Sequence, residues 1–315
     1  MGLGVVSWDP GGGGLVLGGY EEIGPRPGGP STAWCSEGCT TEIKNGDKDM
    51  KDWNELLPSS HTDTFARDRL PPKDQWPVFI ADRPELDYPD QINCAVELVD
   101  RHVQAGRGDR IALHGVSDFN KGGGDFSWTY AQLQDKSHRI AQVLTQDMGL
   151  VPGNRILLRG GNSPMMAAGL LGALKAGLVV VPTMPLLRAG ELAQIIDKAQ
   201  VSAALCDSLL ADELQQCMTP GHASHSASLQ RMVQFRSDAP DGLEQRMARQ
   251  SGAYTAHPTS RDDVCLIAFT SGTTGKPKGT MHFHRDVLAM CDLFPRHILH
   301  MNDTDVVCGT PPVAF

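Results

Sequence analysis

Short apolar runs that alternate with helical patterns constrain the fold of this chain more than any other feature. Three runs have the composition of buried strands: NRILLRG (154–160), LVVVP (178–182) and VSAALCD (201–207). The segments between them carry apolar residues at helical spacing, and the connections are short. Parallel strands need such helical crossovers, and a strand buried on both faces reads as a continuous apolar run. The pattern therefore predicts an α/β fold with a mainly parallel sheet covered by helices on both faces.

Helix start and stop signals support this pattern. Thr129 and Gln132 have the spacing of a capping box. Ser163 followed by Pro164 predicts the start of a second helix, and Gly177 suits its C-terminal end. The helix that follows Thr129 is expected to carry one buried stripe, made of Tyr130, Leu133, Ser137, Ile140, Leu144 and Met148.

Weaker patterns complete the expected order of elements. QINCAVELVDRHVQ (91–104) has helical spacing, and RIALHG (110–115) reads as a strand after a GRGD turn. The region 207–262 is expected to contain a helix near LLADELQQC, a strand at RMVQF and a helix at GLEQRMARQ. The most hydrophobic segment, MMAAGLLGALKAGLVVVPTMPLL, is interrupted by Lys175, Gly177 and Pro182, so it predicts a helix, a turn and a strand instead of a membrane span.

Composition sets limits on the class of protein. The chain has 315 residues, 40% hydrophobic and 21% charged, with a net charge of −9, which argues against a nucleic-acid partner. Its eight cysteines are scattered, as expected for buried free thiols in a reducing cytoplasm. Cys35 and Cys39 lack a second pair at metal spacing, so no metal site is predicted. The N-terminus has no secretion signal, and a cytoplasmic location is expected. Oligomeric state is not indicated.

Residues 1–55 differ from the remainder. They are rich in Gly and Pro, as in GGGGLVLGG and GPRPGGP, and show little helical or strand periodicity. We expect a disordered leader there and assign it no function.

The segment TSGTTGKPKG (270–279) is the main candidate for chemistry. It lies between VCLIAF (264–269) and the alternating run GTMHFH (279–284), so it is expected to be a loop between two strands. Glycines allow close backbone approach, hydroxyls and exposed amides can hold an anion, and two lysines add positive charge. These features favour a polyphosphate ligand. A solvated polar hairpin is the alternative.

The Walker P-loop does not fit this segment. Thr270 stands where that motif needs its first Gly, and Pro277 stands where it needs Ser or Thr. Pro277 also disfavours a helix that begins at Gly275-Lys276, so the helix-dipole site of the Walker motif is not expected.

Two pairs of histidines are spaced as metal ligands could be. His282 and His284 would share one side of a strand, and His297 and His300 are three apart on an expected helix. With no third ligand in view, packing and the start of a helix are favoured for the first pair, and packing for the second.

The segment TSGTTGKPKG resembles the phosphate-loop signature of the adenylate-forming superfamily, the AMP-binding acyl- and aryl-CoA synthetases. FSWTYAQL and LKAGLVVVPTMP resemble two further motifs of that family, in the expected order. MHFHRDVLAMCDLF and PPVAF are most similar to the benzoate and 2-aminobenzoate CoA ligase branch. The resemblance implies that residues 56–315 form part of an N-terminal AMP-binding domain.

The resemblance implies an ATP-dependent acid–thiol ligase. ATP with Mg²⁺ would adenylate a carboxylic acid, and CoA would then take the acyl group. The loop would hold the β- and γ-phosphates, with Lys278 and Thr273 as catalytic residues. Phe315 is expected at the start of the acyl pocket. The residues of this chain expected to bind ATP are Thr270, Ser271, Gly272, Thr273, Thr274, Gly275, Lys276, Lys278 and Gly279; Lys276 falls at a position that the family varies.

The resemblance also implies later elements that this chain does not contain. They include the acidic residue that helps to hold magnesium, the aspartate that binds the ribose, and a small C-terminal domain with its lysine. We therefore expect residues 1–315 alone to make no aryl-CoA. The alternative is a shorter product that binds a nucleotide or a partner without catalysis.

Overall fold

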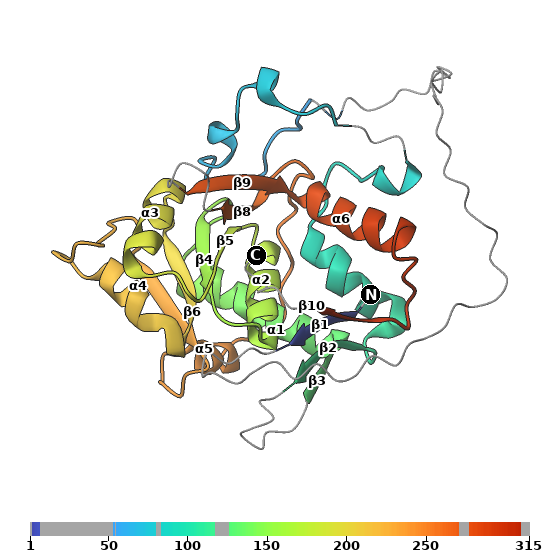
Figure 1. Cartoon of the computed structure of the whole chain (residues 1–315). Coiled ribbons are helices and arrows are strands. Elements are labelled where there is room, and N and C mark those ends of the chain that lie inside the picture. Colours follow the sequence, from blue (N-terminus) through green and yellow to red (C-terminus); the bar gives the residue numbers. More distant parts are fainter. Residues whose placement is uncertain are drawn as a thin grey trace, which may run out of the picture.

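A six-stranded, mostly parallel sheet forms the centre of the computed structural model, which describes residues 2–6, 53, 55–79, 83–116, 126–270 and 277–309 (Figure 1). The strand order is β7-β6-β4-β5-β8-β9, and all neighbours pair in parallel except β8 and β9. The strands are β4 (Arg155–Arg159), β5 (Val179–Thr183), β6 (Ala203–Asp207), β7 (Arg231–Phe235), β8 (Val264–Thr270) and β9 (Lys278–Phe283). The predicted α/β fold is confirmed.

Helices make the crossovers between the parallel strands, as such pairs require. They are α2 (Pro164–Lys175), α3 (Ala189–Ala199), α4 (Ala211–Met218) after the 3₁₀ turn η7 (Ser208–Leu210), and α5 (Leu243–Ala248). α1 (Tyr130–Gln142) precedes the sheet and continues into a π-helical turn, η6 (Val143–Asp147); α6 (His284–His297) follows β9. The expected helices and strands between residues 154 and 284 are thus present.

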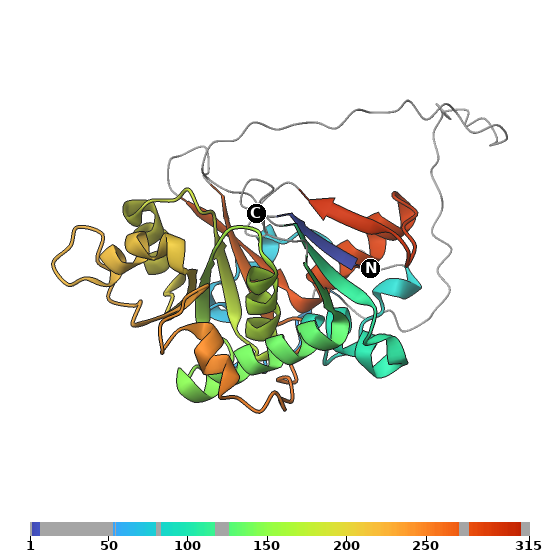
Figure 2. The ribbon, with the colours of Figure 1, turned by 90° about the horizontal axis from the view of Figure 1, so that it is seen from below.

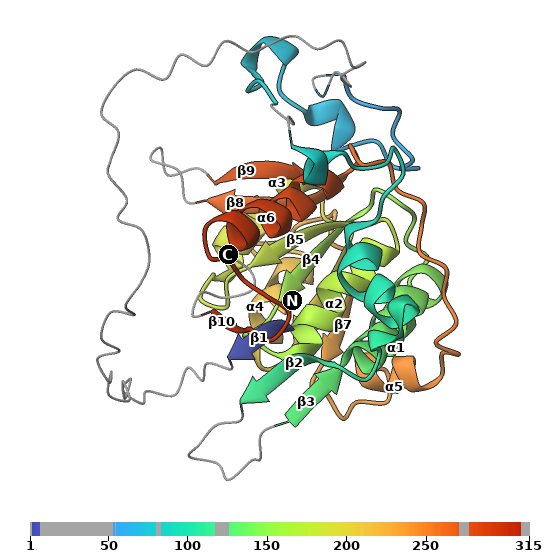
Figure 3. The same cartoon turned by 90° about the vertical axis from the view of Figure 1, so that its right-hand side faces the viewer.

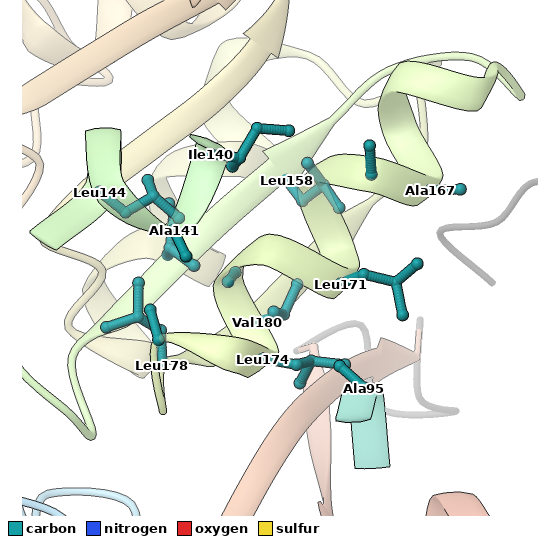
Figure 4. Packing of buried hydrophobic residues seen from close by; sticks show 14 of the residues in the cluster. Ala95, Ile140, Ala141, Leu144, Leu158, Ala167, Leu171, Leu174, Leu178 and Val180 are labelled. Carbon is teal, nitrogen blue, oxygen red and sulfur yellow. The ribbon is translucent and has the colours of Figure 1, made fainter. Parts of the chain in front are cut away.

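The sheet is covered on both faces, as the continuous apolar runs predicted. Along β4, Ile156 and Leu158 pack in the layer of α1, α2 and α5, whereas Leu157 packs in the layer of α3 and α4. Side chains alternate across a strand, so each strand serves both layers. Figure 4 shows the first layer, with Ile140 and Leu171 among its side chains.

The predicted helix ends are confirmed. The Thr129 hydroxyl accepts a hydrogen bond from the Gln132 amide, and the Gln132 side chain accepts one from the Thr129 amide. Ser163 caps α2 through the amide of Met166. Gly177 has φ 71°, and a Cβ there would lie 2.7 Å from the His257 ring, so only glycine fits. The stripe predicted for α1 and the turn after it is buried throughout.

The most hydrophobic segment forms α2, the turn at Gly177 and β5, as predicted. Within it, the Lys175 ammonium is fully buried and lies 2.5 Å from Asp100 and 2.8 Å from the Ser137 hydroxyl. In the part of the chain that the structure describes, no helix has the length and apolar character needed to cross a bilayer.

A smaller sheet lies beside the large one, with strand order β10-β1-β2-β3 (Figure 2). Its strands are β1 (Gly2–Val6), β2 (Ile111–Val116), β3 (Phe126–Thr129) and β10 (Val306–Gly309). β1 was not predicted: the sequence analysis gave residues 1–55 no strand, yet the backbone of Gly2–Val6 pairs in parallel with β2 and β10. Residues 7–52 lie outside the described part.

The N-terminal region before β2 is made of short helical turns. The 3₁₀ turns are η1 (Arg67–Arg69), η2 (Lys73–Gln75) and η3 (Pro84–Leu86), and the π-helical turns are η4 (Val96–Asp100) and η5 (Val103–Arg107). η4 lies within the segment predicted as a helix at 91–104, and η5 begins inside that segment and ends three residues beyond it.

The position of α6 tests the predictions made for the two pairs of histidines. His282 is on β9, but His284 is the first residue of α6, so the two do not share one side of a strand, and the start of a helix at His284 is confirmed. His297 ends α6, whereas His300 lies beyond it with φ 50°, so the expectation of one helix for both is wrong. α6 lies next to β8 and β9 (Figure 3).

Candidate nucleotide-binding site

Two antiparallel strands frame the candidate phosphate loop. Thr270, the last residue of β8, pairs with Lys278, the first residue of β9, and Phe269 pairs with Gly279. β9 begins at Lys278 as a strand, so the segment joins two strands and not a strand and a helix. That prediction is confirmed at the two described ends.

The frame lies at the carboxyl edge of the parallel sheet. β8 pairs in parallel with β5, so Thr270 lies on the same edge as Thr183, where β5 ends. In open α/β sheets, ligands bind outside the carboxyl ends of the strands. The candidate loop therefore starts where this class of fold places its ligands.

The packing explains why position 279 is a glycine, which the sequence alone does not show. A Cβ built on Gly279 would lie 2.9 Å from Cγ2 of Ile267 and 3.2 Å from Cζ of Phe269. Both side chains belong to β8 and lie next to Gly279, so a larger residue at position 279 would displace them. Thr280, the next residue, donates a hydrogen bond from its hydroxyl to the Ala268 carbonyl at 3.0 Å, which adds a second tie between the strands.

Positive charge gathers at the base of the frame. The side chain of Lys278 is exposed, so its ammonium is free to meet a ligand in solvent. The ammonium of Lys198, on α3, donates to the Pro277 carbonyl at 2.8 Å. Lys198 was missed by sequence reasoning, because nothing in a surface lysine of a helix indicates which loop it will reach.

A buried arginine binds the carbonyl groups of the loop after β5, at the same edge of the sheet. Arg159 ends β4 and is 1% exposed. Its guanidinium donates to the carbonyls of Met184, Pro185 and Leu187, at 2.8–2.9 Å, and to that of Leu210 at 3.3 Å. Burial lowers the pKa of Arg159 from its ordinary value. In the sequence, the position of this arginine at the end of the apolar run RILLR is the one sign of its structural role.

The opposite end of β8 is fixed by two buried carboxylates. Asp262 accepts a hydrogen bond from the Leu57 amide at 2.9 Å, and its other oxygen lies 3.0 Å from Nε of Arg285. Asp263 accepts hydrogen bonds from the hydroxyls of Ser59 and Ser60. These contacts tie the segment before η1 to the start of β8.

The second carboxylate is strongly ionised. Burial opposes ionisation of Asp263, but the charge that His61 carries in acid and the hydrogen bonds from Ser59, Ser60 and Ser260 hold its pKa below the usual range. His61 lies 3.9 Å away and is 7% exposed. Burial lowers the pKa of His61 to about 4, against the pull of Asp263, so the imidazole stays neutral near pH 7.

The structure places only part of the predicted site. Thr270, Lys278 and Gly279 lie together at the frame. The remaining predicted residues lie outside the described part of the chain, and their roles stay predictions: Ser271, Gly272, Thr273, Thr274, Gly275, Lys276 and Phe315.

Comparison with known proteins identifies the family. A family model described as "AMP-binding enzyme" matches residues 99–315. The benzoate–CoA ligase of Thauera aromatica is 28% identical over 232 residues, which cover 74% of this chain and 42% of that protein. The chain therefore belongs to the AMP-binding enzyme family, as its phosphate-loop segment indicated. It spans about two fifths of the length of that relative.

Solved structures agree on the fold. ATP-bound MatB from Rhodopseudomonas palustris superposes with a TM-score of 0.56 at 25% identity, over 71% of this chain and 41% of MatB. A long-chain-fatty-acid–CoA ligase from Archaeoglobus fulgidus superposes with a TM-score of 0.63 at 19% identity, over 75% of this chain and 45% of that one. The second likeness concerns the fold alone.

Proposed function

We propose that this chain forms the ATP-phosphate site of an AMP-forming acid–thiol ligase. The observation that carries the proposal is the segment TSGTTGKPKG, set between β8 and β9 at the carboxyl edge of the parallel sheet. Membership of the AMP-binding family supports it. The exposed Lys278 at the end of the segment supplies positive charge where the phosphates of ATP would lie.

The proposed reaction has two steps. A carboxylate oxygen attacks the α-phosphorus of ATP, the bond to the bridging oxygen breaks, and pyrophosphate leaves with the electron pair. The CoA thiolate then attacks the carbonyl carbon of the acyl adenylate and AMP leaves. Lys278 and the hydroxyl of Thr273 would hold the departing pyrophosphate, which is catalysis by positioning and electrostatics. Mg²⁺ would neutralise phosphate charge, and we assign it no protein ligand in this chain.

We further propose an aromatic acid, of the benzoate or 2-aminobenzoate type, as the substrate. The support is the identity with benzoate–CoA ligase and the segments MHFHRDVLAMCDLF and PPVAF. Phe315 would then face the aromatic ring. Relatives that act on long-chain fatty acids share the fold, so the fold does not select the acid.

The test is ATP–pyrophosphate exchange driven by a panel of acids, in a form of the protein extended in frame to the length of its relatives. Benzoate or 2-aminobenzoate should drive exchange more strongly than acetate or a long-chain fatty acid, and Lys278→Ala should reduce it. Exchange with the aliphatic acids alone would remove the aromatic proposal. The competing proposal, a chain that binds ATP without catalysis, predicts ATP binding in equilibrium dialysis with no exchange for any acid.

A further inference from the structure

Two cysteines and one histidine meet in the core near the amino end of β8, the end away from the phosphate loop. Cys94 precedes η4, Cys265 lies on β8, and His284 is the first residue of α6. All three side chains are fully buried, at 0% exposure. One donor atom from each, the two Sγ atoms and an imidazole nitrogen, lies within 4.8 Å of the other two.

The contacts inside this cluster are polar. Nδ1 of His284 lies 3.1 Å from Sγ of Cys94 and 3.2 Å from the Cys94 amide nitrogen. The other ring nitrogen, Nε2, is buried and has no hydrogen-bond partner among the residues that the structure describes. The Cys94 amide donates to Nδ1, so Nδ1 carries the lone pair that a metal ion needs and the ring proton lies on Nε2. An ion bound at Nδ1 would replace this hydrogen bond.

Neither thiol can serve as a ligand until it loses its proton, because the thiolate is the form of cysteine that binds a metal ion. The donor atoms of Cys94, Cys265 and His284 lie within 4.8 Å of one another, so an ion placed among them would displace the protons of both thiols.

We propose that Cys94, Cys265 and His284 form a buried binding site for a thiophilic d¹⁰ cation, with Zn²⁺ as the ion to test. The donors are sulfur and nitrogen, which suit Zn²⁺, whereas Mg²⁺ and Ca²⁺ require oxygen ligands. Zn²⁺ with two thiolates and a neutral imidazole carries no net charge, which removes the main cost of placing an ion in the core. Binding would release the two thiol protons.

The spacing is compatible with such an ion. With bonds of about 2.3 Å to sulfur and about 2.0 Å to nitrogen, a tetrahedral ion places its sulfur and nitrogen ligands about 3.5 Å apart. The observed 3.1 Å between Sγ of Cys94 and Nδ1 of His284 is slightly shorter. A shift of a few tenths of an ångström would therefore fit this pair to the ion, and the other two donor pairs lie within 4.8 Å.

Sequence reasoning predicted no metal site, because it searched for ligands close together in the chain. Here the ligands come from three distant elements. An ion would connect the segment before η4 with β8, one strand of the phosphate-loop frame, and with α6, which follows the other strand. Oxidation to a disulfide is the competing reaction of two adjacent thiols, but full burial keeps oxidants away from both.

The experiment is a Co²⁺ titration of the reduced, metal-free 315-residue protein, followed by competition with Zn²⁺. We expect an intense sulfur-to-cobalt charge-transfer band in the near ultraviolet that saturates at one ion per chain and disappears when Zn²⁺ is added. Zn²⁺ should also raise the midpoint of thermal unfolding. Absence of the band in the folded wild-type protein would overturn the proposal without any variant.

Matched variants locate the site. Cys94→Ala and Cys265→Ala should each abolish the band, with circular dichroism as the check on folding. Cys206→Ala, which removes a buried thiol from β6, and the double variant Cys35→Ala, Cys39→Ala should keep it. A band that is lost in the double variant and retained in Cys265→Ala would assign the ion to the leader and refute the buried site.

Discussion

The two ends of β8 are built in opposite ways. At the amino end, Asp262 and Asp263 are almost completely buried and receive hydrogen bonds from residues near the start of the described chain. At the carboxyl end, Thr270 and its partner Lys278 are exposed. One end of the strand is therefore committed to internal contacts, and the other presents polar groups to solvent.

This difference separates stability from ligand binding along a single strand. Charges that are buried and paired at the amino end cannot be removed without leaving their partners unsatisfied. Charges at the carboxyl end are solvated, and their removal costs the folded state little. Substitutions at the amino end should thus change the stability of the protein, and substitutions at the carboxyl end should change its activity.

The largest expected effect belongs to the amino end. Asp263→Ala removes the acceptor of the Ser59 and Ser60 hydroxyls and of the Ser260 amide. It should lower the free energy of unfolding by about 3–5 kcal/mol, because buried donors lose their partner. Urea denaturation measures this loss. Asp238→Ala, at an exposed position, is the control and should change stability by less than about 0.5 kcal/mol. Equal effects would contradict the comparison.

The next effect belongs to the carboxyl end. Lys278→Ala should cost about 2–4 kcal/mol of transition-state stabilisation, a roughly 30- to 1,000-fold loss of ATP–pyrophosphate exchange in the extended protein. The urea midpoint should not move, since the side chain is exposed. Lys276→Ala is the matched control and should lose less activity. Full exchange in Lys278→Ala would show that this end of β8 does not support catalysis.

A pH dependence follows from His61. Its pKa in the folded protein is about 4, compared with 6.5 in the unfolded chain. Below pH 6.5 the unfolded chain binds a proton that the folded protein does not, so stability falls as the pH falls from 6.5 to 4, by at most about 3 kcal/mol. Urea denaturation across this range should show the slope in the wild type. The slope should be smaller in His61→Gln and unchanged in His222→Gln, at an exposed site; a slope retained in His61→Gln would contradict the assignment.

The smallest effect concerns packing at the frame. Gly279→Ala should destabilise the protein by about 1 kcal/mol, since the new methyl group crowds Ile267 and Phe269 and those side chains can shift only partly. Gly190→Ala, where no atom lies within 4 Å of the new Cβ, should instead stabilise α3 by about 0.5–1 kcal/mol. Thermal unfolding of both variants tests the pair, and equal signs would contradict this account.

The sequence predicted most of the large sheet, because each strand and helix there is specified locally. The capping box at Thr129, the Ser163-Pro164 helix start and the apolar runs each act within a few residues. The frame of the phosphate loop was predicted for the same reason: Pro277 and the alternation after Gly279 are local signals.

Features that depend on distant contacts were missed. The backbone of β1 pairs with β2 and β10, and backbone pairing leaves no mark on the composition of residues 2–6. Ser59 and Ser60, which donate to Asp263, are about 200 residues away from it in the chain, and the three residues of the Cys94 cluster come from separate elements. Periodicity and spacing carry no information about such contacts.

The antiparallel pairing of β9 with β8 has a kinetic consequence. An isolated hairpin closes in about 1–10 μs, because its two strands are neighbours in the chain. Pairing of β8 with β5 must instead wait until the chain through α3, β6, α4, β7 and α5 has been gathered, which makes it a slow, non-local step. The two strands that hold the phosphate loop can therefore pair before the rest of the sheet has formed. The hairpin itself, and not the sheet, then sets the geometry at the base of the loop.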